Sequence, residues 1–128
     1  MGTSELYAAV EALPEITDSL VVDLEFLGRE SYMPLFVVLK DGVELGDELV
    51  SRIRDTIKKN LSPRHVPNDI YDIEDVPRTF SGKKLEIPIR KLLLGQSVEK
   101  VINEDTMGNP ESMNYFIEFA ARIRNAPR

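Results

Sequence analysis

Hydrophobic residues follow a helical period in four stretches of this chain. The first covers residues 3–13 and ends at Pro14, the second begins at Gly46, the third ends at Gly95 and the last opens at Asn109. The faces expected to be buried are Leu6, Ala9, Val10 and Leu13; Leu49, Val50, Ile53, Ile57 and Leu61; Ile89, Leu92 and Leu93; and Met113, Phe116, Ile117, Ala120 and Ile123. Each spacing leaves the opposite face polar, as in helices that pack on one side.

Three other stretches are rich in β-branched and aliphatic residues and predict strands. They cover residues 19–26, 34–40 and 69–73. A short polar loop, residues 28–33, separates the first two, which are therefore expected to pair antiparallel. The second is apolar on both faces and is expected at the centre of the sheet. The order of elements predicts an α+β fold: a small antiparallel or mixed sheet with helices on its faces and a helical extension at the C-terminus.

Length and composition favour one ordinary domain. The chain has 128 residues, of which 42% are hydrophobic, enough for a single core. No apolar run approaches the ~20 residues that span a membrane, and no signal peptide is visible, so we expect a cytoplasmic domain without membrane contact. The absence of cysteine and the presence of one histidine, His65, exclude the common Cys and His metal sites. We therefore expect no metal to be bound by this chain itself.

Charge is distributed unevenly along the chain. The formal net charge is −6, which argues against a general nucleic-acid binder. Residues 52–64 and 78–91 nevertheless hold ten of the sixteen Lys and Arg residues against two acids. Two basic stretches on an acidic body suit a small anionic ligand, although solvated basic helix faces would give the same pattern.

The segment from Pro77 to Lys83 carries the most chemical information. Its polar residues predict a turn in which Gly82 takes a positive φ, so that the ammonium of Lys83 can reach outward toward a developing negative charge. The segment is not a nucleotide-binding P-loop, because Pro77 and Lys84 stand where that motif requires glycine and a hydroxyl residue.

The same segment resembles the last core motif of the acyl-adenylate-forming enzymes, the acyl-CoA synthetase superfamily. That motif reads roughly Pro-Lys/Arg-Thr-x-Ser/Asn-Gly-Lys, and it is matched by Pro77, Arg78, Thr79, Ser81, Gly82 and Lys83. The likeness extends over nearly the whole chain. It identifies residues 1–128 as the mobile C-terminal domain of a larger enzyme, whose large domain for nucleotide and acid would be its partner.

The resemblance implies a reaction and the cofactors that it uses. Members of the superfamily use ATP with Mg²⁺ to convert a carboxylic acid into an acyl-adenylate, and then pass the acyl group to coenzyme A. Lys83 would be the catalytic lysine of the first step, with Pro77, Thr79, Ser81 and Gly82 supporting it, and the domain would rotate before the second step. The isolated chain is expected to bind none of these cofactors and to be inactive.

The sequence after Lys83 narrows the resemblance further. Its Gly-Lys-Lys-x-Glu-x-Pro variant and the later Asn109-Pro110-Glu111-Ser112 resemble the branch that acts on acetoacetate. Two alternatives stay open: a synthetase for another short-chain acid, and a stand-alone module that binds an anion or a partner. Acid specificity would be decided in the large domain.

Four further residues have competing interpretations. Lys58 aligns near a basic position that, in related synthetases, contacts the phosphates of coenzyme A, but it is also a typical solvated helix lysine. Lys84 is the rival of Lys83 for the catalytic role, and the motif favours the first lysine. His65 lies in a loop flanked by prolines and is expected to be structural, and Phe80 is expected to pack the lysine turn down.

Overall fold

A computed structural model of the chain describes residues 3–24 and 32–125. Its helices are α1 (Thr3–Glu11), α2 (Asp47–Asn60), α3 (Glu86–Leu93), α4 (Val98–Val101) and α5 (Met113–Asn125), and its strands are β1 (Ile16–Val21), β2 (Pro34–Leu39) and β3 (Asp69–Asp72). Single turns of 3-10 helix occupy Pro63–His65, Glu104–Thr106 and Pro110–Ser112. The α+β class predicted from the sequence is confirmed.

The three strands form one mixed sheet in the order β1-β2-β3. β1 pairs antiparallel with β2, and β3 pairs parallel with β2. The parallel pair needs a crossover connection, which α2 supplies. The central position predicted for β2 is confirmed. Its residues Leu35, Phe36 and Val37 are fully buried, Phe36 on one face of the sheet and Leu35 and Val37 on the other.

The first strand differs from its predicted bounds. β1 begins at Ile16, three residues earlier than expected, and ends at Val21. An irregularity in its pairing between Ile16 and Asp18 inserts one residue. As a result, the side chains of Ile16 and Val21 belong to the same hydrophobic core. This extra residue breaks the alternation by which strands are identified from sequence. Phe26 and most of the predicted 28–33 loop lie outside the described residues.

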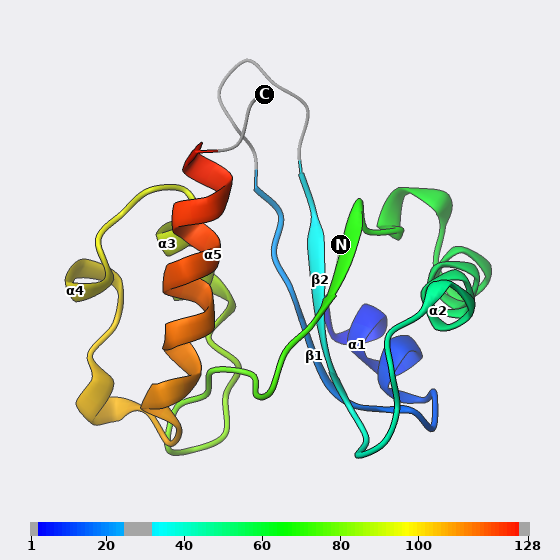
Figure 1. The fold of residues 1–128 in the computed structure, drawn as a ribbon, viewed down its shortest axis with the longest axis horizontal. Helices are drawn as coiled ribbons and strands as arrows, with labels where there is room; N and C mark the ends of the chain where they lie inside the picture. The colour runs from blue at the N-terminus through cyan, green and yellow to red at the C-terminus, as the bar shows by residue number, and fades with distance from the viewer. Residues whose placement is uncertain (1–2, 25–31, 126–128) are drawn as a thin grey trace.

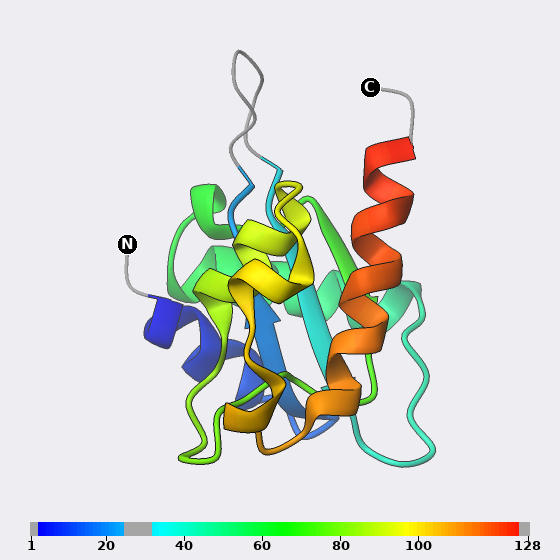
Figure 2. The ribbon, with the colours of Figure 1, turned by 90° about the vertical axis from the view of Figure 1, so that its left-hand side faces the viewer.

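Helices cover both faces of the sheet, and each face has its own core (Figure 1). α1 and α2 cover one face, where Leu6, Val10, Ile53 and Ile57 are fully buried. α3 and α5 cover the other, where the ring of Phe36 packs edge-on against Phe116 and Phe119 with ring centres 4.9 and 5.2 Å apart. The predicted C-terminal extension is therefore an integral layer of the fold (Figure 2).

The end of α3 was predicted closely, whereas the buried faces of α5 and α2 differ in part from the prediction. α3 ends at Leu93, two residues before the predicted stop Gly95, whose φ of +109° lets its N–H and that of Gln96 bond back to the carbonyls of Leu92 and Lys91. In α5 the prediction placed Ile117 on the buried face, but Ile117 is 37% exposed and Phe119 is buried instead. The face of α5 turned to the sheet is centred on Phe116, which leaves Ile117 at its margin. Val50 of α2 is likewise only half-buried.

Within the described residues, no helix is both long and apolar enough to cross a bilayer.

Candidate functional site

The lysine turn is a tight hairpin that Gly82 makes possible. The N–H of Thr79 donates to the carbonyl of Lys83 at 3.0 Å, and the N–H of Gly82 donates to the carbonyl of Thr79 at 2.9 Å. Gly82 has φ +91°, as predicted, which is the left-handed conformation that closes a three-residue hairpin loop. The hydroxyl of Thr79 bonds both Ser81 Oγ and the N–H of Lys83. The backbone around Lys83 is thus fixed locally.

Lys83 and Lys84 point in different directions because they are consecutive residues of the extended arm of the hairpin. Successive side chains of an extended strand lie on opposite faces, and Lys84 pairs with Arg78 across the hairpin. Lys83 is exposed, and within residues 3–24 and 32–125 its ammonium has no hydrogen bond or ion pair. The side chain of Lys84 is only 15% exposed.

The ammonium of Lys84 is fully engaged against α1 and β1. It lies 2.7 Å from Glu11 Oε2, 2.6 Å from the carbonyl oxygen of Ser19 and 3.4 Å from Asp18 Oδ1. It also lies 3.5 Å from the centre of the Tyr7 ring. Since β1 is an edge strand, the bond to Ser19 satisfies a carbonyl that no neighbouring strand could reach. Lys84 is therefore held as a structural residue.

Tyr7 closes the same edge of the sheet next to Lys84. Its hydroxyl accepts a bond from the N–H of Val21 at 3.1 Å and donates to the carboxylate of Glu86 at the start of α3. Burial, followed by the hydrogen bond to Glu86, raises the pKa of the Tyr7 phenol well above its ordinary value. Tyr7 therefore remains a neutral donor and links α1, β1 and α3.

Arg78 connects the base of the hairpin to the sheet. Its guanidinium lies 2.8 Å from both carboxylate oxygens of Asp18, and Nη1 donates to the carbonyl of Gly82 at 2.5 Å. The side chains of Arg78 and Asp18 are 32% and 17% exposed, so the pair is partly screened from water.

The C-terminal extension holds the other side of the hairpin. The backbone N–H of Phe80 donates to the carbonyl of Thr106 at 3.1 Å, and the backbone N–H of Gly108 donates to the carbonyl of Arg78 at 3.1 Å. The side chain of Asn109 accepts from the N–H of Arg78 at 3.0 Å and donates to the carbonyl of Val76 at 2.8 Å. The hairpin and the segment 106–109 run side by side in Figure 2.

The structure also locates the remaining residues of the motif. Pro77 is buried, while Thr79 is half-buried and Ser81 and Gly82 are exposed. The expectation that Phe80 packs the turn down is wrong, because Phe80 is 74% exposed. The hydrogen bonds of Arg78 and Asn109 hold the turn instead. Sequence reasoning missed Tyr7, Glu11, Asp18 and Asn109, which lie far from the motif in the chain and carry no local signal.

Lys58 does not share a site with Lys83. It is exposed in the last turn of α2, which covers the face of the sheet opposite to α3 and α5 (Figure 1). Of the basic residues around it, Arg52 pairs with Glu15 and Glu48, and Arg54 donates to the carbonyl of Asn68. His65 bonds Ser62 Oγ through Nδ1 at 2.6 Å, as a structural histidine would.

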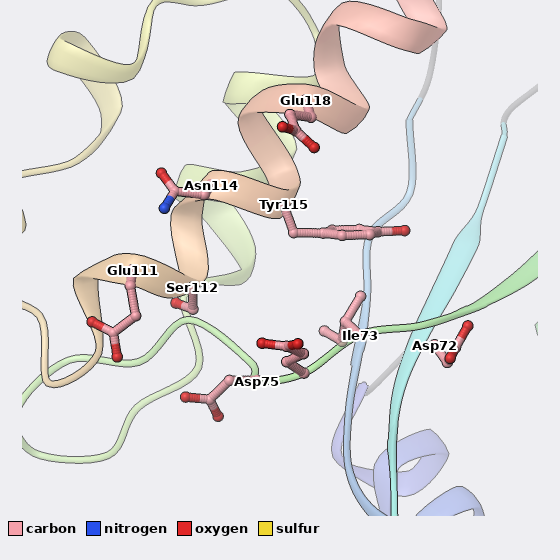
Figure 3. Close-up of a pocket in the computed structure, with 9 residues that line it drawn as sticks. Asp72, Ile73, Asp75, Glu111, Ser112, Asn114, Tyr115 and Glu118 are labelled. Carbon is pink, nitrogen blue, oxygen red and sulfur yellow. The ribbon is translucent and has the colours of Figure 1, made fainter. Parts of the chain in front are cut away.

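A surface hollow between α5 and the segment after β3 has the wrong charge for a nucleotide (Figure 3). Its lining includes the carboxylates of Asp72, Glu74, Asp75, Glu111 and Glu118. Five acids would repel phosphates, so this hollow does not belong to the lysine site. Among the residues that the structure describes, no group of His, Asp and Glu is arranged to hold a metal ion.

Comparison with known proteins identifies the family of the chain. Residues 5–83 match the family model of the AMP-binding enzyme C-terminal domain, and the match ends at the motif lysine. The chain belongs to this family, the domain that adenylate-forming acid–CoA ligases carry at their C-terminus.

The proteins similar to this chain include several acetoacetyl-CoA synthetases. The chain is 37% identical to acetoacetyl-CoA synthetase of Caenorhabditis elegans over 93% of its own length, and 36% identical to that of Rhizobium meliloti over 91%. The chain spans 17% of either relative. The solved acetoacetyl-CoA synthetase from Streptomyces lividans superposes with a TM-score of 0.89 at 41% identity, covering 96% of this chain and 18% of that one. An acyl-CoA synthetase from Brucella canis gives 0.64 at 28% identity, over 72% of this chain and 17% of that one.

Proposed function

We propose that this chain is the C-terminal domain of an AMP-forming acid–CoA ligase and that Lys83 is its catalytic residue. During adenylation the carboxylate of the acid attacks the α-phosphate of ATP and pyrophosphate leaves. Both reactants are anions, and the ammonium of Lys83 would lie between them and lower their repulsion. The observation that carries the proposal is the exposed ammonium of Lys83, which has no partner among the described residues and lies on a hairpin whose backbone is fixed.

The environment of the two lysines supports this choice. An ammonium already bonded to Glu11, Ser19 and Asp18 cannot turn to a substrate without breaking those bonds, which argues against a catalytic role for Lys84. Removal of one preorganised donor from a developing charge typically lowers kcat about 10²–10³-fold. We expect a loss of this size when Lys83 is replaced.

The acid and the thiol are assigned from the relatives. We infer that the acid is acetoacetate, because the named relatives at 36 and 37% identity are acetoacetyl-CoA synthetases. We also infer that Lys58 contacts a phosphate of coenzyme A in the second half-reaction, when another face of the domain meets the large domain. Mg²⁺ would enter with ATP and be held by residues outside this chain.

A domain exchange tests the proposal directly. Residues 3–125 would replace the matching C-terminal segment of the Streptomyces lividans enzyme, which shares the fold at a TM-score of 0.89. The chimera should show acetoacetate-dependent ATP–pyrophosphate exchange. Lys83→Ala should lower that exchange at least 100-fold and leave the formation of acetoacetyl-CoA from supplied acetoacetyl-adenylate within about threefold. Lys91→Ala, an exposed lysine of α3, is the matched control and should change neither.

Three further measurements separate the alternatives. The isolated chain should show no exchange, and turnover by it would contradict the proposal. Tight binding of coenzyme A to the isolated chain in calorimetry would favour the stand-alone module. The acid is tested on the polypeptide expressed from the chain's own gene, which should prefer acetoacetate to acetate and propionate.

A further inference from the structure

We propose that Asp18 is a positioning residue for Lys83. This inference rests on the proposed function and extends it to a residue that lies 60 positions before Arg78 and outside the motif. The Asp18 carboxylate binds both residues at the base of the hairpin, Arg78 on one arm and Lys84 on the other.

The need for Asp18 follows from the charges at the base of the hairpin. Arg78 and Lys84 are a cross-strand pair, and two like charges directly opposite each other destabilise such a pair. Asp18 Oδ1 lies 2.8 Å from Arg78 Nη2 and 3.4 Å from Lys84 Nζ, so one carboxylate oxygen faces both cations. Glu11 supplies the second negative charge, but of the two cations it pairs only with Lys84, and its Oε2 also accepts a bond from the Ser19 hydroxyl at 2.6 Å.

Arg78 links the Asp18 carboxylate to the backbone of Gly82, the residue before Lys83. While two nitrogens of its guanidinium bond Asp18, Nη1 donates to the carbonyl of Gly82. An arginine held by a carboxylate on one side has a fixed orientation, and it therefore fixes the carbonyl that it bonds on the other. A two-stranded hairpin has little stability of its own in water, so this anchor, together with the contacts of segment 106–109, determines where the Lys83 backbone lies.

The local strand geometry directs Asp18 toward the hairpin. Asp18 follows the inserted residue of β1, and such irregularities re-aim the side chains beside them. Its Oδ1 also accepts the N–H of Ser19 at 2.9 Å, which orients the carboxylate. The side chain is 17% exposed, so water competes weakly for the two cations.

The test uses the chimera with the Streptomyces lividans large domain, in which the two half-reactions are measured separately. Asp18→Asn keeps the shape and removes the charge. We expect kcat for adenylation to fall at least tenfold, KM for ATP and acid to change less than threefold, and thioester formation from supplied adenylate to stay within twofold. Asp18→Glu, which keeps the charge, should recover most of the loss. Asp23→Asn, an exposed aspartate just after β1, is the matched control and should leave adenylation unchanged.

Hydrogen exchange on the isolated chain gives a second, activity-free measurement. In Asp18→Asn the amides of residues 80–83 should exchange at least tenfold faster, while those of α2 are unchanged. If Asp18→Asn fails to fold, Arg78→Gln removes the other half of the same contact and should give the same selective loss. Equal losses in both half-reactions, or adenylation within twofold of the parent, would overturn the role of Asp18. The proposed function fails separately, if Lys83→Ala itself leaves adenylation intact.

Discussion

Lys84 and Glu11, 73 residues apart in sequence, meet at 2.7 Å beneath the lysine hairpin. Their contact makes the second lysine of the Gly-Lys-Lys sequence a part of the fold. The first lysine, Lys83, remains exposed on the other side of the same backbone. Two neighbouring residues of identical chemistry thereby lie in different environments.

The two lysines should differ in their effect on stability. Lys84→Met leaves Glu11 and Asp18 without one cation and is expected to lower the free energy of unfolding by about 2 kcal/mol. This value lies between the ~1 kcal/mol of an exposed ion pair and the 3–5 kcal/mol of a fully buried one. Lys83→Met should change it by no more than about 0.5 kcal/mol. Urea denaturation followed by circular dichroism measures both, and equal losses would contradict the structural role of Lys84.

The turn should tolerate asparagine better than alanine at Gly82. A Cβ there would meet nothing within 4 Å, so the cost arises from the positive φ alone. Gly82→Ala is expected to lower the free energy of unfolding by about 1 kcal/mol. Gly82→Asn should cost less, since asparagine adopts the left-handed conformation more readily. Thermal denaturation of the two variants decides this point; alanine no worse than asparagine would speak against the hairpin geometry.

Asn109 should matter more than its half-buried position suggests. Asn109→Ala removes the acceptor of the Arg78 N–H and a donor to the Val76 carbonyl. We expect a loss of about 2 kcal/mol, because two partly buried backbone groups lose their partners. Asn114→Ala, at an exposed position in the first turn of α5, should change the free energy of unfolding by no more than about 0.5 kcal/mol. A similar value for both variants in urea denaturation would contradict the role of Asn109 in holding the lysine hairpin.

Alkaline solution should destabilise the protein through Tyr7. The unfolded phenol ionises near pH 10, whereas burial and Glu86 raise the pKa in the folded state, so above pH 10 the unfolded state binds fewer protons. The stability from this group is complete below pH 10 and is lost as the pH rises further, at up to about 1.4 kcal/mol per pH unit. Tyr7→Phe should therefore have a flatter dependence of unfolding free energy on pH in this range. Parallel curves for parent and variant would refute this assignment.

The sequence predicted those features that depend on neighbouring residues. The central strand β2, the positive φ of Gly82 and the stop of α3 shortly before Gly95 all follow from a few consecutive side chains. The catalytic candidate Lys83 came from a motif of the same length. Phe80 is the exception, because an aromatic residue in a turn indicates burial only where a partner surface exists, and here it is 74% exposed.

The features that the sequence did not predict depend on distant partners. Nothing near Asp18 indicates that its carboxylate will meet Arg78, and the early start of β1 at Ile16 was hidden by an inserted residue that disrupts the alternation. The predicted buried face of α5 was wrong by part of a turn. Whether Ile117 or Phe119 is buried depends on the sheet against which the helix packs. In each case the deciding contact is tertiary.

The double attachment of the lysine hairpin bears on when it can form during synthesis. Its anchors come from Asp18 on one side and Asn109 on the other, so the native contacts need a chain completed nearly to α5. Contacts between residues so far apart in sequence form late, because closing long loops is slow. A nascent chain that ends at Lys83 would hold the complete motif and Asp18 but would lack the anchor of Asn109. The native lysine hairpin is therefore expected to form only near the end of the folding of this domain.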